Sequence, residues 1–304
     1  MNIIENLELN DTSYKSLIVY KYGQGYIVNK KNNQQVNIRS IAKTILALAC
    51  GILIEKHIGF NEETYIYPII KNKVNLSNTK NEKYLKQIKV KHLLTHSVGY
   101  RDILLMSKDI NKFNVDNLLT EVINHPIYYK PETYFLYSNA SYFILAAAME
   151  EVLGYDLFDF IEENLFKPLA IKNAKADKYG DYLAGATKFY LSADDLLKIG
   201  KLLLNNGNFE GRQIVSKDWI KKMKAPYFDN NQEAKQKYLS EDYYGYSLWQ
   251  SENGIIFASG TGGQLIVLLE KLGTIIVTTN NGSDNYGYKI KNEVDTIIEK
   301  LNRG

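Results

Sequence analysis

Strand-like patterns lie at both ends of this chain, and helix-like patterns fill the part between them. Near the start, the short β-like runs 16–20 and 25–29 are separated by the turn-forming residues Tyr22, Gly23 and Gln24. The last third holds the β-rich runs 244–250, 255–259, 264–270 and 274–279, with tight-turn candidates at Asn253-Gly254 and Leu272-Gly273. We therefore expect one sheet built from both chain ends, in an α+β fold with a large helical region inserted.

The helical region is predicted from the pattern of apolar residues. The segment 40–56 is too long for a strand and apolar on nearly every face, which is typical of a buried helix. Further helices are expected at 115–124, 139–153, 157–165 and 193–204, and a final amphipathic one at 290–301. This layout predicts a sheet lobe of residues 1–59 and 190–304 and a helical lobe of residues 60–189. The active site is expected at their junction, within one structural unit.

The composition describes an ordinary globular protein, because 45% of the 304 residues are apolar and 23% are charged. The formal charge is only +3 and the lysines are scattered, so we expect no nucleic-acid partner. The short cluster of Lys221, Lys222 and Lys224 is typical of a solvated helix face. Cys50 is the only cysteine, so no intrachain disulfide can form.

The sequence predicts no membrane insertion. Its longest apolar run, 45–54, is far shorter than the ~20 residues that cross a bilayer. Residues 1–15 include Glu5, Glu8 and Asp11 and lack the continuous apolar stretch of a secretory signal. These features predict a cytoplasmic protein, unless the sequence has lost an original leader.

Ser40 and Lys43 are the first candidate catalytic pair. A serine hydroxyl needs a neighbouring base, and residues three apart at a helix start project from nearly the same face. Apolar neighbours favour the neutral amine of Lys43, and the Ser40 amide at the helix N-terminus can donate to an oxyanion. A second S-x-x-K, from Ser77 to Lys80, lies in a polar stretch that would solvate its lysine. The first pair equally fits an N-cap serine followed by a surface lysine.

Two further elements carry polar groups suited to a site. Tyr137 and Asn139 form the only Y-x-N of the chain and offer a phenol for proton transfer and an amide for a substrate. The same segment fits a helix N-terminus capped by Ser138 or Asn139, with Tyr137 packed beneath it. The glycine-rich stretch 258–264 lets backbone approach a ligand and can supply an oxyanion donor, but it also fits a plain β connection.

In this order, the three elements resemble the serine β-lactamases, the penicillin-binding proteins and the class C-like esterases and peptidases. Residues 90–99, VKHLLTHSVG, are similar to the family segment I-x-H-L-L-T-H-T-S-G. Residues 134–154, 164–169 and 184–207 are similar to its F-x-Y-S-N loop and helix, its L-F-x-P-L-G turn and its A-G-G-L-x-S-T-A-x-D-L segment. The resemblance covers nearly the whole chain and implies a β-lactamase/transpeptidase-like fold.

The resemblance also implies roles for the site residues. Ser40 would be the nucleophile, Lys43 its proton acceptor and Tyr137 a shared general base and acid, while Asn139 would bind the acyl side of the substrate. The amides of Ser40 and Thr261 would form the oxyanion hole. In the third motif, Ser259 and Gly260 would match the last two residues of K-T-G. A small-molecule or peptide substrate and an acyl-serine intermediate follow from these roles.

The third motif departs from the family pattern, because Ala258 stands where the family has lysine or histidine. That cation often holds a substrate carboxylate, so its loss favours an esterase, amidase or transacylase over a β-lactamase or D-alanyl peptidase. Arg39 is a candidate replacement charge, although a surface arginine is the more ordinary interpretation. A non-catalytic ligand-binding protein on the same fold stays an alternative.

No cofactor or metal is expected. His92 and His96 have the i, i+4 spacing of a zinc helix, but Leu93 replaces the glutamate of H-E-x-x-H and no third ligand stands out. The chain has no G-x-S-x-G elbow, no G-x-G-x-x-G fingerprint and no Walker A loop.

Overall fold

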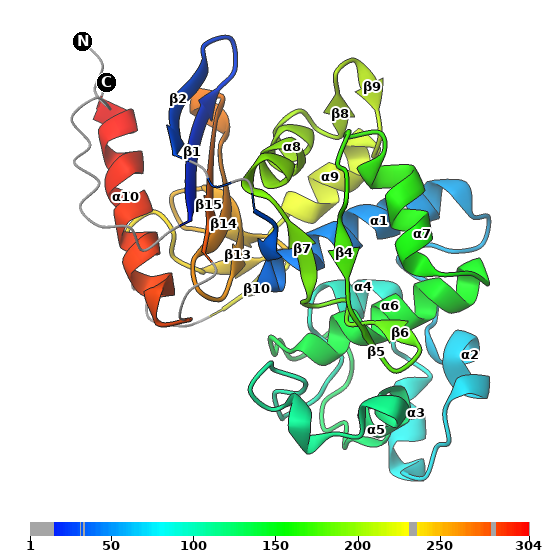
Figure 1. Ribbon diagram of the computed structural model, residues 1–304. Coiled ribbons are helices and arrows are strands. Elements are labelled where there is room, and N and C mark those ends of the chain that lie inside the picture. Colours follow the sequence, from blue (N-terminus) through cyan, green and yellow to red (C-terminus); the bar gives the residue numbers. More distant parts are fainter. Residues whose placement is uncertain (1–14, 31, 33, 231–235, 281–283, 304) are drawn as a thin grey trace. The chain divides into compact units, whose positions relative to one another are not determined.

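The computed structural model describes residues 15–30, 32, 34–230, 236–280 and 284–303. They form two compact units (Figure 1). The sheet unit contains the described parts of residues 1–41, 173–175 and 189–304, and the helical unit contains residues 42–172 and 176–188.

An eight-stranded antiparallel sheet is the centre of the sheet unit, with the order β10-β11-β12-β13-β14-β15-β1-β2. Its strands are β1 (Ser16–Lys21), β2 (Gly25–Lys30), β10 (Phe228–Asp229), β11 (Tyr243–Tyr244), β12 (Trp249–Gln250), β13 (Ile256–Gly260), β14 (Gln264–Leu269) and β15 (Thr274–Thr279). β1 pairs with β15 along its whole length, from Ser16 opposite Thr279 to Lys21 opposite Thr274. The sheet is therefore built from both ends of the chain, as the sequence predicted.

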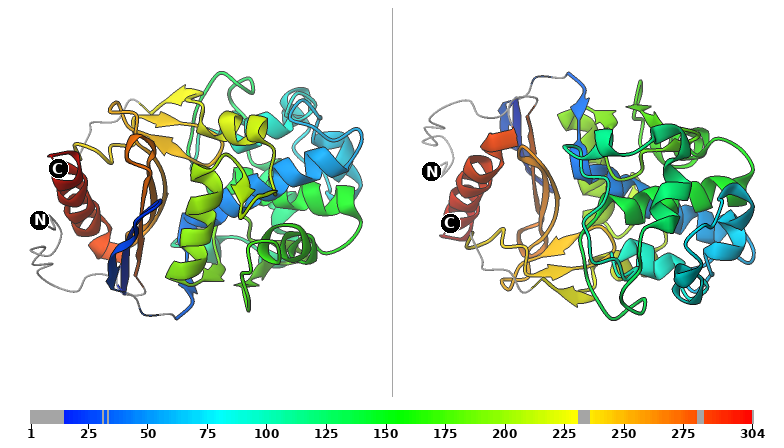
Figure 2. Two further views of the ribbon diagram at one scale, coloured as in Figure 1. Left: turned by 90° about the horizontal axis from the view of Figure 1, so that it is seen from above. Right: turned by 90° about the horizontal axis from the view of Figure 1, so that it is seen from below.

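Helices cover both faces of this sheet. α8 (Ala193–Leu204) lies on one face and α10 (Gly287–Arg303) on the other, as the views in Figure 2 agree. α8 comes close to the sheet at Gly200, where an added Cβ would lie 2.8 Å from Ile275 of β15. α10 buries the apolar side chains of Ile290, Val294, Ile297 and Ile298. Both helices are strongly amphipathic, so each buries one apolar face and leaves a polar face at least partly exposed. Such a pattern can be recognised in the sequence.

The strand expected at 244–250 is wrong. The chain forms two short strands there, β11 and β12, which pair antiparallel with Tyr244 opposite Trp249. Between them, Gly245 approaches the carbonyl oxygen of Met223 so closely that an added Cβ would lie 2.4 Å from it. This contact with the end of α9 (Lys217–Lys224) turns the chain back, and the β-propensity of the run gives no sign of it.

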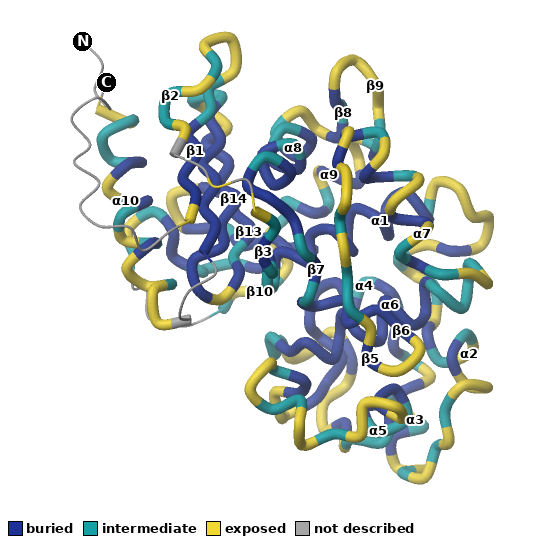
Figure 3. Tube along the Cα trace, in the orientation of Figure 1, coloured by how far each residue is buried: buried dark blue, intermediate teal, exposed yellow. Residues whose placement is uncertain are grey.

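The helical unit is organised around α6 (Asn139–Leu153), which is buried from Asn139 to Met149 (Figure 3). α1 (Ala42–Lys56), α2 (Tyr67–Ile70), α4 (Val90–Leu94), α5 (Leu118–Asn124) and α7 (Leu157–Ile161) all pack against it. α1 and α6 are apolar on nearly every face because each is surrounded by other elements. The predicted bounds 139–153 and 193–204 are those of α6 and α8.

The remaining elements are short. The helical unit also contains α3 (Glu82–Leu85), β5 (Lys178–Tyr179), β6 (Tyr182–Leu183), the π-helical turn η6 (Glu162–Phe166) and the 3-10 turns η2 (Lys71–Lys73), η3 (Thr79–Asn81), η4 (Ile110–Lys112) and η5 (Val115–Asn117). Outside it lie β3 (Val36–Asn37), β7 (Phe189–Leu191), β8 (Asn208–Phe209), β9 (Arg212–Gln213), η1 (Arg39–Ile41), η7 (Glu270–Leu272) and η8 (Asp284–Tyr286), and β4 spans Lys175–Ala176. The helix predicted at 115–124 thus begins as η5 and continues as α5.

The sequence predicts that residues 1–59 belong with the sheet, whereas the N-terminal part of the sheet unit ends at Ile41 and α1 is part of the helical unit. The packing of α1 against α6 accounts for this difference. Across the described residues, no helix has both the length and the apolar character that crossing a membrane requires.

Candidate active site

Ser40 lies in the 3-10 turn η1, which runs directly into α1. The residue before it, Arg39, has φ +53°, a left-handed conformation that costs a non-glycine residue about 1–2 kcal/mol. The side-chain oxygen Oδ1 of Asn37 accepts the Arg39 N–H at 2.9 Å and thereby holds this turn. Because the backbone is helical from η1 onward, Lys43 follows Ser40 by about one turn.

Gly260, at the end of β13, allows η1 to pack closely against that strand. An added Cβ at this position would lie 2.7 Å from the carbonyl oxygen of Ile38 and 3.0 Å from Cβ of Arg39. The glycine of the third motif is therefore a packing requirement of the turn that presents Ser40. The sheet unit thus brings together Arg39, Ser40 and the A-S-G-T segment.

Side chains from β14 and the end of β15 hold the turn that follows Gly260. The Gln264 side chain accepts the N–H of Asn280 at 3.0 Å and donates to its carbonyl oxygen. The side-chain amide of Asn280 donates to the carbonyl oxygen of Gly262 at 3.0 Å. Thr261 is exposed at the tip of this turn, and Ser259 before it is half-exposed. Sequence reasoning missed Asn37, Gln264 and Asn280. The backbone partners of Gln264 and Asn280 are distant in sequence, and the partner of Asn37 depends on the geometry of the turn.

Lys43 is the centre of the second group of site residues, all in the helical unit. Its side chain is 1% exposed, which rules out the surface lysine that the S-x-x-K spacing also allowed. Nζ donates to Oδ1 of Asn139 at 2.8 Å and to the carbonyl oxygen of Ala186 at 3.2 Å. It also lies 4.7 Å from the ring centre of Tyr137. The structure thus brings Lys43, Tyr137 and Asn139 together.

Burial changes the protonation of Lys43. Removal from water disfavours the ammonium form and lowers the pKa of Lys43 from 10.5 to about 7. A neutral amine has two N–H donors and one lone pair. Asn139 and Ala186 accept N–H groups of this amine, and the nitrogen of the neutral form is a base that can take up a proton. In contrast, Lys80 of the second S-x-x-K is exposed, together with Ser77.

Asn139 is fixed at both ends of its amide. Its Nδ2 donates to the carbonyl oxygen of Leu105 at 2.8 Å, and its Oδ1 faces Lys43. Leu105 has φ +61°, a strained conformation for a leucine, which aims its carbonyl group at the amide. In this structure Asn139 therefore orients the Lys43 amine, a contact that the expected role at the substrate did not include.

Tyr137 is half-buried and precedes α6 by two residues. Ser138 is the N-cap of α6, and its Oγ accepts the N–H of Ala140 at 3.4 Å. The capping interpretation of the Y-x-N segment is therefore correct for Ser138, and it coexists with the contact between Tyr137 and Lys43. The tyrosine ring also lies 4.6 Å, centre to centre, from the ring of His96.

Ala258 is 1% exposed within β13, opposite Ile266 of β14. Arg39, the candidate replacement for the family cation, is half-exposed. Among residues 15–30, 32, 34–230, 236–280 and 284–303, no group of three or more histidine, cysteine, aspartate or glutamate side chains is arranged to hold a metal. Nδ1 of His92 instead accepts the N–H of Lys89 at 3.1 Å.

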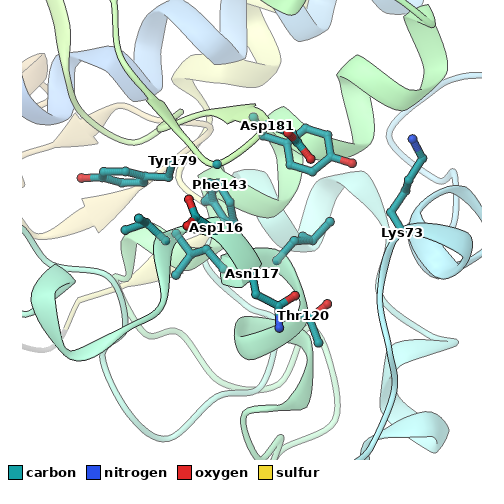
Figure 4. A pocket seen from close by; sticks show the side chains of 12 residues that line it. Lys73, Asp116, Asn117, Thr120, Phe143, Tyr179 and Asp181 are labelled. Carbon is teal, nitrogen blue, oxygen red and sulfur yellow. The ribbon is translucent and has the colours of Figure 1, made fainter.

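A small pocket of about 80 Å³ lies elsewhere in the helical unit (Figure 4). Phe143, one turn along α6 from Asn139, lies beside it, and Gly180 and Asp181 come from the connection between β5 and β6. None of the predicted site residues lines it. The chemistry suggested by the sequence is therefore separate from this pocket.

Comparisons with known proteins concern the family and the fold of this chain. A family model described as Beta-lactamase matches residues 17–295. "Penicillin-binding protein 4*" of Bacillus subtilis (strain 168) is 26% identical over 177 residues, which are 52% of this chain and only 35% of that protein. The chain thus matches about a third of the length of this curated relative.

Two solved structures share the fold at low identity. The octameric penicillin-binding protein homologue from Pyrococcus abyssi superposes with a TM-score of 0.72 at 21% identity, over 93% of this chain and 73% of that chain. The D-amino acid amidase from Ochrobactrum anthropi SV3 superposes with a TM-score of 0.70 at 15% identity, over 95% and 93% of the two chains. With the family model matched from β1 into α10, these findings show that the chain belongs to the beta-lactamase family.

Proposed function

We propose that this protein is a serine hydrolase that cleaves a small-molecule or peptide ester or amide through an acyl-Ser40 intermediate. The observation that carries the proposal is the state of Lys43: a buried amine with a pKa of about 7, which donates to the fixed oxygens of Asn139 and Ala186. It follows the hydroxyl of Ser40 by one turn of continuous helix. A base tuned close to neutral pH is what serine activation requires.

Acylation would proceed in two steps. Oγ of Ser40 attacks the substrate carbonyl carbon while its proton passes to the lone pair of Lys43, and the carbonyl oxygen becomes an oxyanion that accepts the N–H groups of Ser40 and Thr261. The intermediate then collapses. The bond to the leaving alcohol or amine breaks, and a proton from Lys43, passed through the Tyr137 hydroxyl, neutralises the leaving group.

Deacylation reverses the roles. A water molecule gives a proton to the same base, and its oxygen forms a bond to the acyl carbon. The bond from that carbon to Oγ of Ser40 then breaks, the serine regains its proton, and a carboxylic acid leaves. An amine or alcohol in place of water would give a transacylase, which is the alternative within this mechanism.

The third motif narrows the substrate class. Ala258 offers no charge, and it is a buried side chain on a central strand. A substrate carboxylate would therefore lack the cation that the family commonly places there. We propose that neutral esters and amides are preferred over β-lactams, whose recognition commonly involves a carboxylate.

The test is covalent labelling. Wild-type protein is incubated with a fluorophosphonate, with p-nitrophenyl acetate and with a cephalosporin, and intact mass is measured beside p-nitrophenol release. We expect a phosphonyl adduct and ester turnover, both lost by at least ~10³-fold in Ser40→Ala and retained in Ser77→Ala. Equal labelling or turnover in Ser40→Ala would contradict the mechanism.

The same experiment addresses a non-catalytic protein on this fold, the alternative that the loss of the family cation at Ala258 motivates. That alternative predicts no covalent adduct with any of the three reagents. It also predicts that reversible binding of the ester, followed by calorimetry, survives Ser40→Ala unchanged. Adding a primary amine to the ester reaction separates hydrolysis from acyl transfer, because transfer yields an amide product.

A further inference from the structure

His96 lies directly after α4, at a point where the chain turns sharply. It is 1% exposed, and its φ of +54° is in the left-handed region. Such a conformation is uncommon for a non-glycine residue and is maintained only where surrounding contacts determine it. The contacts that hold His96 in this conformation therefore indicate its role in the structure.

Both residues that flank Tyr137 bond to His96. The carbonyl oxygen of His96 accepts the N–H of Leu136 at 3.0 Å. The ring nitrogen Nδ1 of His96 accepts the N–H of Ser138 at 3.4 Å. One residue thus fixes the backbone immediately before and immediately after Tyr137.

The imidazole ring also contacts the tyrosine itself. Its centre lies 4.6 Å from the ring centre of Tyr137 and 5.1 Å from that of Tyr142, at interplanar angles of 49° and 48°. Lys43 Nζ is 4.7 Å from the first of these tyrosine rings and 5.9 Å from the second. Tyr142 is itself fixed, because its hydroxyl donates to the carbonyl oxygen of Leu94 at 2.9 Å. His96 therefore contacts both of the tyrosine rings that lie close to the lysine amine.

A histidine here has a physical cost that apolar packing would avoid. Burying an imidazole requires that its polar atoms find partners, and burial together with the nearby Lys43 holds the pKa of His96 well below 6.5. The ring is thus neutral. Because Nδ1 accepts a hydrogen bond, the proton of the neutral ring is on Nε2. A phenylalanine or leucine would fill the space but leave the Ser138 N–H without its acceptor.

We propose that His96 is a positioning residue for Tyr137, which sets the backbone and ring of that tyrosine against Lys43 through its carbonyl oxygen, its Nδ1 and its ring face. This inference rests on the proposed acyl-serine function, in which Tyr137 passes protons. His96 itself neither gives nor takes a proton in the reaction.

The first test compares two amide replacements. In His96→Asn, the oxygen Oδ1 occupies the position of Nδ1 and can accept the Ser138 N–H, whereas in His96→Gln the longer side chain places its amide near Nε2. With p-nitrophenyl acetate as substrate, we expect His96→Asn to keep kcat within about 3-fold of wild type. His96→Gln should lose 10- to 100-fold, roughly the cost of displacing a catalytic group by up to 1 Å, with KM within about twofold. Equal kcat values, or a more active His96→Gln, would overturn the proposal.

The second test is a double-mutant cycle with Tyr137→Phe. If His96 acts through Tyr137, His96→Gln should cost little further activity once the phenol is gone. The preference of asparagine for positive φ affects stability in both backgrounds, so thermal melting curves separate it from the activity effect. A loss from His96→Gln that is as large in Tyr137→Phe as in wild type contradicts positioning and indicates a general structural role.

A third measurement uses the wild-type protein, so it does not depend on the variants folding. Nitrogen NMR of ¹⁵N-histidine-labelled protein should show the His96 ring neutral and protonated on Nε2 at pH 6.5, where an ordinary histidine is half-protonated, because its pKa is held well below that value. A ring protonated on Nδ1 would overturn the inference. If the fluorophosphonate experiment failed while this result held, the contact would stand and the catalytic function would fall, so the two failures are distinguishable.

Discussion

The two groups of site residues are held in place by different means. In the sheet unit, the turn at Ser40 is held largely by backbone: a left-handed Arg39, a hydrogen bond to Asn37 and the absence of a side chain at Gly260. In the helical unit, Lys43 is held by buried side chains and by desolvation. The position of Ser40 therefore depends on backbone conformation and close packing, whereas the state of Lys43 depends on charge and protonation.

This difference predicts how each group responds to change. Activity should fall when side-chain volume or backbone conformation changes at the Ser40 turn, but its pH dependence should stay the same. Changes in the polarity around Lys43 should instead shift the pH dependence of activity. The following variants test that contrast, from the largest expected effect to the smallest.

Lys43→Met should remove nearly all activity, by about 10²–10⁴-fold, because the base for Ser40 is lost. The variant should also change stability in a pH-dependent way. The unfolded chain keeps a proton on Lys43 up to its ordinary pKa of 10.5, whereas the folded chain releases it near 7. Between these values the unfolded state binds more protons, so wild-type stability rises with pH.

Denaturant unfolding at pH 7 and pH 10 checks this expectation. Wild type should gain stability over this interval relative to Lys43→Met, and the variant should be the more stable protein at pH 7. Lys80→Met, at the exposed lysine of the second S-x-x-K, is the control and should leave activity and this pH dependence unchanged. A wild type and a Lys43→Met with parallel pH profiles would contradict a buried, neutral lysine.

Gly260→Ala should lower kcat by about 10²-fold, because the added methyl group meets the backbone oxygen of Ile38 at 2.7 Å and displaces the Ser40 turn. The pH at half-maximal activity should not move, since Lys43 is untouched. Gly254→Ala is the control: the φ of +76° strains the alanine that replaces this glycine, but nothing lies within 4 Å of the added Cβ. The activity of Gly254→Ala should equal that of wild type. A shifted pH profile in Gly260→Ala would contradict the proposed difference between the Ser40 turn and Lys43.

Asn139→Asp should move the pH profile with little loss of maximal rate. A carboxylate at 2.8 Å favours the ammonium form of Lys43 and raises its pKa by about 1–3 units, so activity appears at higher pH. The measurement is kcat/KM from pH 5 to 10. Asn164→Asp, whose amide bonds to Phe160 in a different part of the helical unit, should keep the wild-type profile. An unmoved profile in Asn139→Asp would mean that Lys43 does not limit the rate.

Arg39→Gly tests the smallest effect. Compared with Arg39→Ala, which keeps Cβ, it should be the more stable variant, because the ~1–2 kcal/mol that a positive φ costs alanine exceeds the ~0.4–1 kcal/mol that the freedom of glycine in the unfolded state costs. Thermal and urea unfolding of both variants measure the difference. If alanine proved the more stable replacement, the turn at Ser40 would not be strained.

The sequence predicted the elements well where amphipathic or strongly apolar patterns govern them, as in α6, α8, β14 and β15. It failed at 244–250, because a backbone contact from α9 breaks that run. Within the site, Lys43, Tyr137 and Asn139 were found from motifs, and the structure brings them together.

The supporting residues were harder to find. In the sequence, His96 stands out only by its zinc-like spacing from His92 and by its place in the segment 90–99. Its bonds to Leu136 and Ser138 join residues 40 or more positions apart, which no local pattern records. Asn37 has the spacing of a side chain that caps a turn two residues later, so that signal was present in the sequence.

The pairing of β1 with β15 affects how the chain folds during its synthesis on the ribosome. Ser16 pairs opposite Thr279, so β1 has no partner in β15 until all the residues between them have been made. During that time the β1–β2 hairpin has an unpaired edge, while the segment containing α1 and α6 is already complete and able to collapse. Pairings so distant in sequence form slowly, and exposed edges invite aggregation. Synthesis rate and chaperone supply should therefore govern the yield of native protein more strongly than they would for a chain of local contacts.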